Sequence, residues 1–192
     1  MVDLQEIIEK LRNSEVIDKA GYKYIILPFD IKAVPNDIRI LSDSLQSEIT
    51  KTLEGRDFDK IVTIESKGIL VSTLIALNLN KPLYIIRKRS LHLAGEMKVE
   101  KSTGYEKSDV YINDLHEGDK IIIVDDLIST GGTLKAILGA LHEIKCLIKG
   151  IFVIFDKPDY GGSKFIRKNY PIPLKTLIKI KIKENNEIEV YT

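Results

Sequence analysis

The sequence is poor in cysteine and in aromatic residues: its 192 residues include one cysteine, no tryptophan and five phenylalanines. A lone cysteine, Cys146, forms neither an internal disulfide nor a cysteine-based zinc site, and we expect it to be an ordinary buried residue. An excess of one charge is also missing, because 29 Lys and Arg residues stand against 28 Asp and Glu residues. This balance excludes the broad positive field of a general nucleic-acid binder, so any anion site must be local.

Long apolar runs are missing as well. No stretch approaches the roughly 20 consecutive apolar residues that a membrane-spanning helix requires. Residues 1–10 carry acidic side chains where a secretory signal would have a basic start and a continuous apolar segment. We therefore expect a cytoplasmic protein that has neither a membrane nor a nucleic acid as its partner.

The apolar residues, 44% of the chain, are sufficient for one sizeable core. Their spacing predicts four helices, over 4–11, 37–53, 69–79 and 134–141, and five strands, over 22–28, 61–64, 83–87, 121–125 and 151–155. Helices that alternate with strands indicate an α/β fold with a parallel sheet. Near the end, alternating Ile and Lys residues over 178–183, followed by Asn185 and Asn186, predict a hairpin.

One polar stretch, between Lys88 and Asp109, shows no sustained hydrophobic period. It is longer than most loops inside compact domains, which are usually short unless they are functional or disordered. We therefore interpret it as a disordered or functional loop.

The strongest functional signal lies in residues 121–133. An apolar strand leads into Asp125 and Asp126, which places two carboxylates where ligands of open α/β sheets bind. The next segment, Ser-Thr-Gly-Gly-Thr at 129–133, combines glycines that admit an anion, hydroxyl donors and the positive end of the following helix. Because carboxylates repel a phosphate, they must bind sugar hydroxyls or a hard cation, so the segment suits a sugar phosphate.

This segment resembles the signature of type I phosphoribosyltransferases, which transfer ribose 5-phosphate from 5-phosphoribosyl 1-pyrophosphate (PRPP) to a nucleobase and release pyrophosphate. The resemblance implies a single domain over 1–192, with a parallel-sheet core over about 36–156, helices on both faces, and a small hood subdomain from about 1–35 and 157–192. It also implies that Asp125 and Asp126 hold the ribose hydroxyls, directly or through Mg²⁺. The 5′-phosphate would lie against Ser129, Thr130, Gly131, Gly132 and Thr133.

Two further segments resemble the purine branch of this family. Residues 64–68 follow a strand and open a helix, as the pyrophosphate loop of adenine phosphoribosyltransferases does. The resemblance implies that pyrophosphate contacts Ser66, Lys67 and Gly68. Arg87 and Lys88 form a cationic strand end that suits the same highly charged leaving group.

Parts of the polar stretch, residues 93–96 and 102–105, resemble the mobile loop that covers the active site of this family. Tyr105 matches a loop tyrosine, and the resemblance implies a catalytic role for it. Adenine enzymes usually carry a glutamate proton donor immediately before this tyrosine, where Gly104 stands here, and many 6-oxopurine enzymes have an aspartate in place of Ser129. Glu96 is then our candidate for the proton donor to the purine.

The signals for the purine base are divided. The Glu-Ser-Lys-Gly loop at 65–68 favours adenine, which we expect by a narrow margin. Residues 102–114 are closer to archaeal hypoxanthine/guanine enzymes, and Lys157 stands where relatives that bind 6-oxopurines present a donor to the carbonyl oxygen. Phe29 is a candidate for stacking on the purine. The alternatives are a surface charge for Lys157 and core packing for Phe29.

Three other functions remain as alternatives. A regulator that senses PRPP or purines would need a DNA-binding module, and only about 20 residues precede the strand at 22–28. A PRPP synthetase would have two similar halves, and the sequence shows no internal repeat. An orotate phosphoribosyltransferase would carry a characteristic lysine and histidine arrangement in its catalytic loop, which we do not find. The resemblance further implies that the protein is a homodimer.

Overall fold

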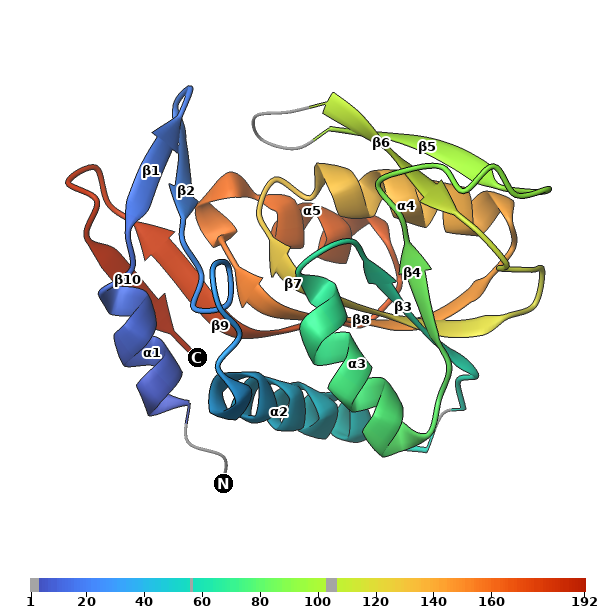
Figure 1. The fold of residues 1–192 in the computed structure, drawn as a ribbon, viewed down its shortest axis with the longest axis horizontal. Coiled ribbons are helices and arrows are strands. Elements are labelled where there is room, and N and C mark those ends of the chain that lie inside the picture. Colours follow the sequence, from blue (N-terminus) through green and yellow to red (C-terminus); the bar gives the residue numbers. More distant parts are fainter. Residues whose placement is uncertain (1–3, 56, 103–106) are drawn as a thin grey trace.

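A six-stranded sheet forms the centre of the protein in the computed structural model, which describes residues 4–55, 57–102 and 107–192 (Figure 1). The strand order is β10-β9-β8-β7-β3-β4, and all neighbours are parallel except β9 and β10. The strands are β3 (Lys60–Ile64), β4 (Leu83–Ile86), β7 (Lys120–Ile128), β8 (Leu147–Asp156), β9 (Leu174–Ile182) and β10 (Ile188–Tyr191). The predicted α/β fold with a parallel sheet is confirmed.

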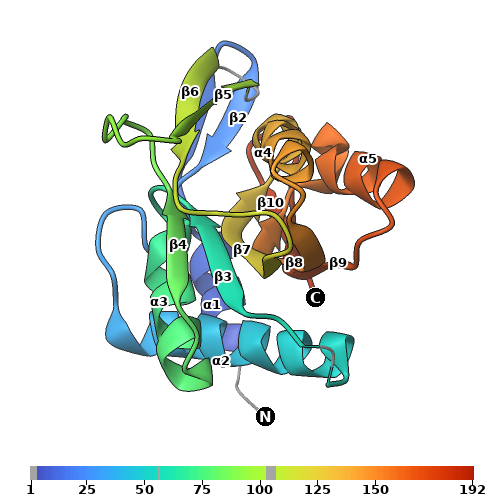
Figure 2. The same ribbon diagram turned by 90° about the vertical axis from the view of Figure 1, so that its right-hand side faces the viewer.

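Helices cover both faces of this sheet (Figure 2). The described helices are α1 (Gln5–Arg12), α2 (Pro35–Leu53), α3 (Gly68–Leu79), α4 (Gly132–Glu143), α5 (Gly162–Asn169) and a short 3₁₀ helix (Pro158–Tyr160). One apolar cluster joins α2 and α3 to one face, and a second joins α4 and α5 to the other. None of the helices in the described part of the chain has the length and apolarity that crossing a bilayer requires.

Strand β7 lies near the middle of the sheet and is buried on both faces. Ile122 and Val124 belong to the apolar cluster with α2 and α3, whereas Ile121 and Ile123 belong to the cluster with α4. Burial on both faces explains why this segment is a continuous apolar run rather than an alternating one. The strand continues past the predicted end at residue 125, so both aspartates lie inside β7.

A small hairpin, β1 (Val16–Lys19) with β2 (Tyr22–Ile25), stands apart from the main sheet. It projects from the side of the molecule where β7 ends (Figure 1). Helix α1 precedes it and packs against β10. Residues 174–191 extend the main sheet beside β8, so the sheet does not end at the expected core boundary near residue 156. The predicted hairpin near residues 178–190 is confirmed as β9 and β10.

The polar stretch after Lys88 contains a third hairpin, β5 (Met97–Ser102) with β6 (Lys107–Ile112), which was not predicted from the sequence. Val99, Val110 and Ile112 are buried in the cluster with α4, which supplies the apolar face that the hairpin needs. The other face of the hairpin carries exposed charged residues such as Lys98 and Glu100, so the buried Val99 between them was not recognised as part of a strand pattern. Figures 1 and 2 show that the β1–β2 and β5–β6 hairpins project from the same side of the molecule.

Candidate active site

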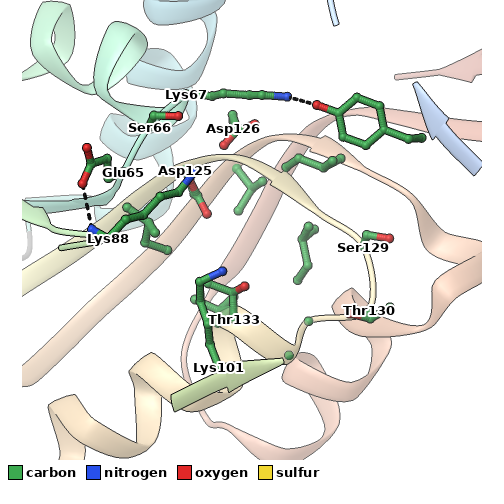
Figure 3. Close-up of a pocket in the computed structure, with 18 of the residues that line it drawn as sticks. Glu65, Ser66, Lys67, Lys88, Lys101, Asp125, Asp126, Ser129, Thr130 and Thr133 are labelled. Carbon is green, nitrogen blue, oxygen red and sulfur yellow. Dashed lines mark hydrogen bonds between the residues drawn. The ribbon is translucent and has the colours of Figure 1, made fainter. Parts of the chain in front are cut away.

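A cavity of about 280 Å³ lies at the carboxyl ends of β3 and β7 (Figure 3). Its lining comes from β7, the loop between β3 and α3, the loop between β7 and α4, and the β1–β2 and β5–β6 hairpins. Most of the predicted site residues meet here: Ser66, Lys67, Lys88, Asp125, Asp126, Ser129, Thr130, Gly131, Gly132 and Thr133. Residues from distant parts of the sequence therefore share one pocket.

Residues 129–133, which we call the anion loop, turn from the end of β7 into the first turn of α4. Gly131 has a φ of 76°, in the left-handed region that favours glycine, and it is the N-cap of α4. The hydroxyl of Tyr22 donates a hydrogen bond to Ser129 Oγ over 3.0 Å, which ties the β1–β2 hairpin to the loop. The loop offers backbone N–H groups and the positive helix end to an anion.

Asp125 and Asp126 place two carboxyl groups beside this anion loop (Figure 3). Burial raises the pKa of Asp125 well above its ordinary value, and the neighbouring charge of Asp126 raises it further. Burial also raises the pKa of Asp126. Both groups are thus held in a place that disfavours their charge, and a bound cation or a set of hydroxyl donors would relieve this cost.

Gly68 begins α3 directly against β7. A Cβ atom at this position would lie 2.6 Å from Thr63 Oγ1 and 2.8 Å from Asp125 Oδ1, which is closer than real Cβ atoms approach. The missing side chain therefore lets the β3–α3 loop pass beside the carboxyl group of Asp125. Gly68 supports the pocket from behind, and it lies outside the cavity lining found among the described residues.

Lys67 connects the β3–α3 loop with the segment after β2. Its ammonium group lies 2.7 Å from Asp30 Oδ1 and donates a hydrogen bond to the Tyr24 hydroxyl over 2.5 Å. Burial opposes the charge on Lys67, but hydrogen bonds with Asp30 and Tyr24 outweigh it, and the pKa of Lys67 is raised. The side chain is a charged link between two walls of the pocket.

Arg87 and Lys88 contact the β3–α3 loop through Glu65. The Lys88 backbone N–H donates to Glu65 Oε2 over 2.7 Å, and Arg87 Nε lies 3.4 Å from the same oxygen. Lys88 lines the cavity. Arg87 is not among the described residues that line it. Glu65 itself lines the cavity and was not among the predicted site residues.

Lys101 is a pocket residue that the sequence analysis missed. It belongs to β5, is 8% exposed, and lines the same cavity as Asp125 and Thr133 (Figure 3). Its positive charge acts against the rise in the pKa of Asp125. Tyr22 and Tyr24 of the β1–β2 hairpin also line the cavity. No sequence signal distinguished Lys101, because it stands in a stretch rich in lysine whose hairpin was not recognised.

Glu96 fixes a turn instead of facing the cavity. Its carboxylate accepts hydrogen bonds from the Ser90 hydroxyl, the Leu91 N–H and the Asn113 amide. The Ser90 hydrogen bond, with those of Leu91 and Asn113, lowers the pKa of Glu96 to about 2. In this arrangement Glu96 is ionised at neutral pH and has no proton to donate. The other loop candidate, Tyr105, lies outside the described residues.

The two candidate base-binding residues are both buried. Phe29 is 5% exposed and stacks on Phe155 with ring centroids 5.9 Å apart, which is the core packing considered as its alternative. Lys157 is 1% exposed, so it is not a surface charge. Its ammonium group donates to the Lys23 carbonyl and lies 4.2 Å from the ring centroid of Tyr22. Burial lowers the pKa of Lys157 to about 8.

Three comparisons with known proteins relate this chain to phosphoribosyltransferases. Residues 31–178 match the family described as phosphoribosyl transferase domain. The chain is 38% identical over 182 residues to a hypoxanthine/guanine phosphoribosyltransferase from Ferroglobus placidus, covering 95% of each sequence. It is 43% identical over 157 residues to HGPRTase-like protein 2 from Haloquadratum walsbyi, covering 80% of this chain and 84% of that protein. The solved adenine phosphoribosyltransferase from Thermoanaerobacter pseudethanolicus matches with a TM-score of 0.71 at 26% identity, over 92% of this chain and 99% of that one.

Proposed function

The chain belongs to the phosphoribosyltransferase family, as an enzyme of its purine branch, and we propose that its bases are hypoxanthine and guanine. The observation that carries the chemistry is one cavity lined by two adjacent carboxyl groups and an anion loop at a helix N-terminus. The narrow expectation of adenine is not confirmed. Relatives that are 35–43% identical are named as hypoxanthine/guanine or HGPRTase-like proteins, whereas the adenine enzyme with a similar structure is 26% identical.

Each wall of the cavity has a role in this proposal. The anion loop binds the 5′-phosphate of PRPP, and Asp125 and Asp126 hold the ribose 2′- and 3′-hydroxyls. Ser66 and the backbone around it contact the pyrophosphate. The purine nitrogen forms a bond to C1′ of the ribose and releases its proton to solvent, while the bond from C1′ to the pyrophosphate oxygen breaks. Negative charge therefore grows on the leaving oxygen, and nearby ammonium groups stabilise it.

Mg²⁺ fits this acidic pair as a metal shared with the substrate. The described residues include no group of three or more His, Cys, Asp or Glu side chains that would form an all-protein metal site. Mg²⁺ is commonly bound through one or two carboxylates together with substrate phosphates and water, which matches Asp125 and Asp126 beside an anion loop. Bound in this way, Mg²⁺ would neutralise part of the pyrophosphate charge.

Lys157 is the proposed donor to the carbonyl oxygen of a 6-oxopurine. An ammonium group has three N–H donors, and the Lys23 carbonyl accepts one of them. A pKa of about 8 leaves the group mostly protonated at neutral pH. Lys157 is 1% exposed and lies outside the cavity lining found among the described residues, so the rings of Tyr22 and Tyr160 must move for a base to reach it. Phe29 packs in the core, and we propose no contact between its ring and the base.

We expect kcat/KM for hypoxanthine or guanine to exceed that for adenine by at least about a hundredfold. A site that is built to hydrogen-bond one polar group rejects an analogue that leaves the group unpaired. Initial rates with each base at saturating PRPP and Mg²⁺ measure this ratio. A preference for adenine would refute the proposed base while leaving the family assignment intact.

The proposed assembly is a homodimer that covers α3. This helix exposes Leu70 by 36% and Leu77 by 71%, two apolar side chains seven residues apart and therefore on one helix face. We expect Leu77→Glu to shift the protein towards a monomer in size-exclusion chromatography with light scattering, because the charge would be buried in the interface. Leu147→Glu, at an exposed leucine of β8, is the control. A wild-type monomer, or a dimer that is insensitive to Leu77→Glu, would contradict this placement.

A further inference from the structure

The back of the anion loop rests on a second glycine turn, Gly161 and Gly162, which opens α5. The Gly162 N–H donates a hydrogen bond to the Ser129 carbonyl over 2.9 Å. Gly161, with a φ of 77°, is the N-cap of α5. This hydrogen bond brings the backbones of the two turns into direct contact, although residues 129 and 162 are far apart in the sequence.

The contact leaves no room for a side chain at Gly162. A Cβ atom there would lie 2.2 Å from the Ser129 carbonyl oxygen, 2.5 Å from the Gly131 nitrogen and 2.7 Å from the Thr130 carbonyl carbon. All three are backbone atoms, so no side-chain rotation can relieve the overlap. A Cβ atom at Gly131 would lie 3.0 Å from the Gly162 Cα, which shows the same close approach from the other side.

The end of β8 fixes both turns. Asp156 pairs in register with Ile128, the residue immediately before the anion loop, and the Lys157 N–H donates to the Ile128 carbonyl over 2.9 Å. Asp156 and Ser163 are 1% and 3% exposed, and Ser163 opposes the rise in the pKa of Asp156 that burial causes. The end of β8 therefore lies beside both the entry of the anion loop at Ile128 and the first turn of α5 at Ser163.

We infer that Gly162 is a positioning residue for the anion loop. It lies outside the cavity lining found among the described residues, and it determines where the backbone of residues 129–131 stands in relation to the phosphate. Its effect on phosphate binding rests on the proposed function, which assigns the 5′-phosphate to this loop. Neither glycine of the second turn carried a signal in the sequence, because the contact is long-range.

Gly162→Ala tests this inference by forcing the two backbones apart. A displacement near 1 Å is enough to reduce binding or rate markedly, and we expect at least about a tenfold loss of affinity for ribose 5-phosphate. Affinity for pyrophosphate with Mg²⁺, on the opposite wall, should stay within about twofold. Both affinities are measured by calorimetry. Gly139→Ala is the control, because a Cβ atom at this α4 position meets nothing within 4 Å.

Amide resonances of residues 129–132 in the ligand-free protein give a second readout that does not depend on function. They should shift in Gly162→Ala and stay in place in Gly139→Ala; unmoved resonances would overturn the inference.

If the wild type does not bind ribose 5-phosphate, the proposed role of the loop is wrong, and these resonances alone decide whether Gly162 positions it. If Gly162→Ala does not fold, Ser163→Ala replaces it: weaker ribose 5-phosphate binding with unchanged pyrophosphate binding supports the inference, and unchanged affinity for both refutes it.

Discussion

Replacing Asp125 and Asp126 together by asparagine is expected to lower kcat at least about a hundredfold. The substitution keeps the shape of both side chains and removes the two negative charges that hold ribose hydroxyls and Mg²⁺ in our proposal. Initial rates of pyrophosphate formation at saturating PRPP measure the effect. Asp114→Asn is the matched control, since Asp114 is exposed. Near-normal turnover in the double variant would remove the acidic pair from the site.

Asp125→Asn alone is expected to stabilise the ligand-free fold at pH 8. Burial raises the pKa of Asp125, so ionisation costs folding free energy as the pH rises from the unfolded value of about 4 through the raised value. An asparagine side chain at this position does not ionise and has no such cost. We expect Asp125→Asn to raise Tm at pH 8, in the direction set by the raised pKa of Asp125.

At pH 4 and below, the difference in Tm should become small, because the carboxyl group is then neutral in both the folded and the unfolded state. Differential scanning calorimetry of the ligand-free proteins at several pH values measures this trend. A lower Tm for Asp125→Asn at pH 8 would mean that the carboxylate is stabilised by contacts in the ligand-free protein, contrary to the direction of its pKa.

The second large effect is expected from Lys101→Met. The Lys101 side chain brings an ammonium group from β5 into the cavity, and its charge influences the carboxyl group of Asp125. In our proposal this ammonium group stabilises the negative charge that develops on the departing pyrophosphate. Loss of one preorganised electrostatic contact of this kind costs about 10²–10³ in kcat, so we expect a fall of at least about a hundredfold. The KM for PRPP should change less, because the charge develops mainly in the transition state.

Lys98 provides a matched control for Lys101 on the same strand. Its side chain is 62% exposed, and its ammonium group lies 2.9 Å from Asp109. Lys98→Met should therefore leave kcat within about twofold of the wild type. Equal losses in the two variants would attribute the effect to the stability of the β5–β6 hairpin, and no loss in Lys101→Met would remove this residue from the chemistry.

Local sequence patterns were sufficient to predict most of the sheet and the centre of the site. The apolar run at 121–124 and the residues 125–133 form one continuous segment, in which the strand, the carboxyl pair and the anion loop follow one another. The structure of such a segment can be predicted from its own residues, without knowledge of distant contacts. The parallel order of the strands then followed from the alternation of strands with helices.

The residues that escaped prediction depend on contacts between distant segments. Lys101 enters the pocket only because β5 and β6 pair and pack Val99 and Val110 against α4. Gly162 matters only because α5 begins behind the anion loop. In a single sequence, a lysine in a polar stretch and a glycine in a turn have many ordinary interpretations. Glu96 shows the converse, because the carboxylate of this candidate proton donor accepts hydrogen bonds within its own turn and lies outside the cavity lining found among the described residues.

The central claim is that this cavity binds PRPP and transfers its ribosyl phosphate to a purine. The most direct test incubates the protein with PRPP and Mg²⁺ and supplies hypoxanthine, guanine, adenine, xanthine and orotate separately, while nucleotide and pyrophosphate are quantified. We predict equal amounts of pyrophosphate and of IMP or GMP with the first two bases. Tight binding of PRPP without a nucleotide product from any of the five bases would contradict the claim and favour a regulator that senses PRPP.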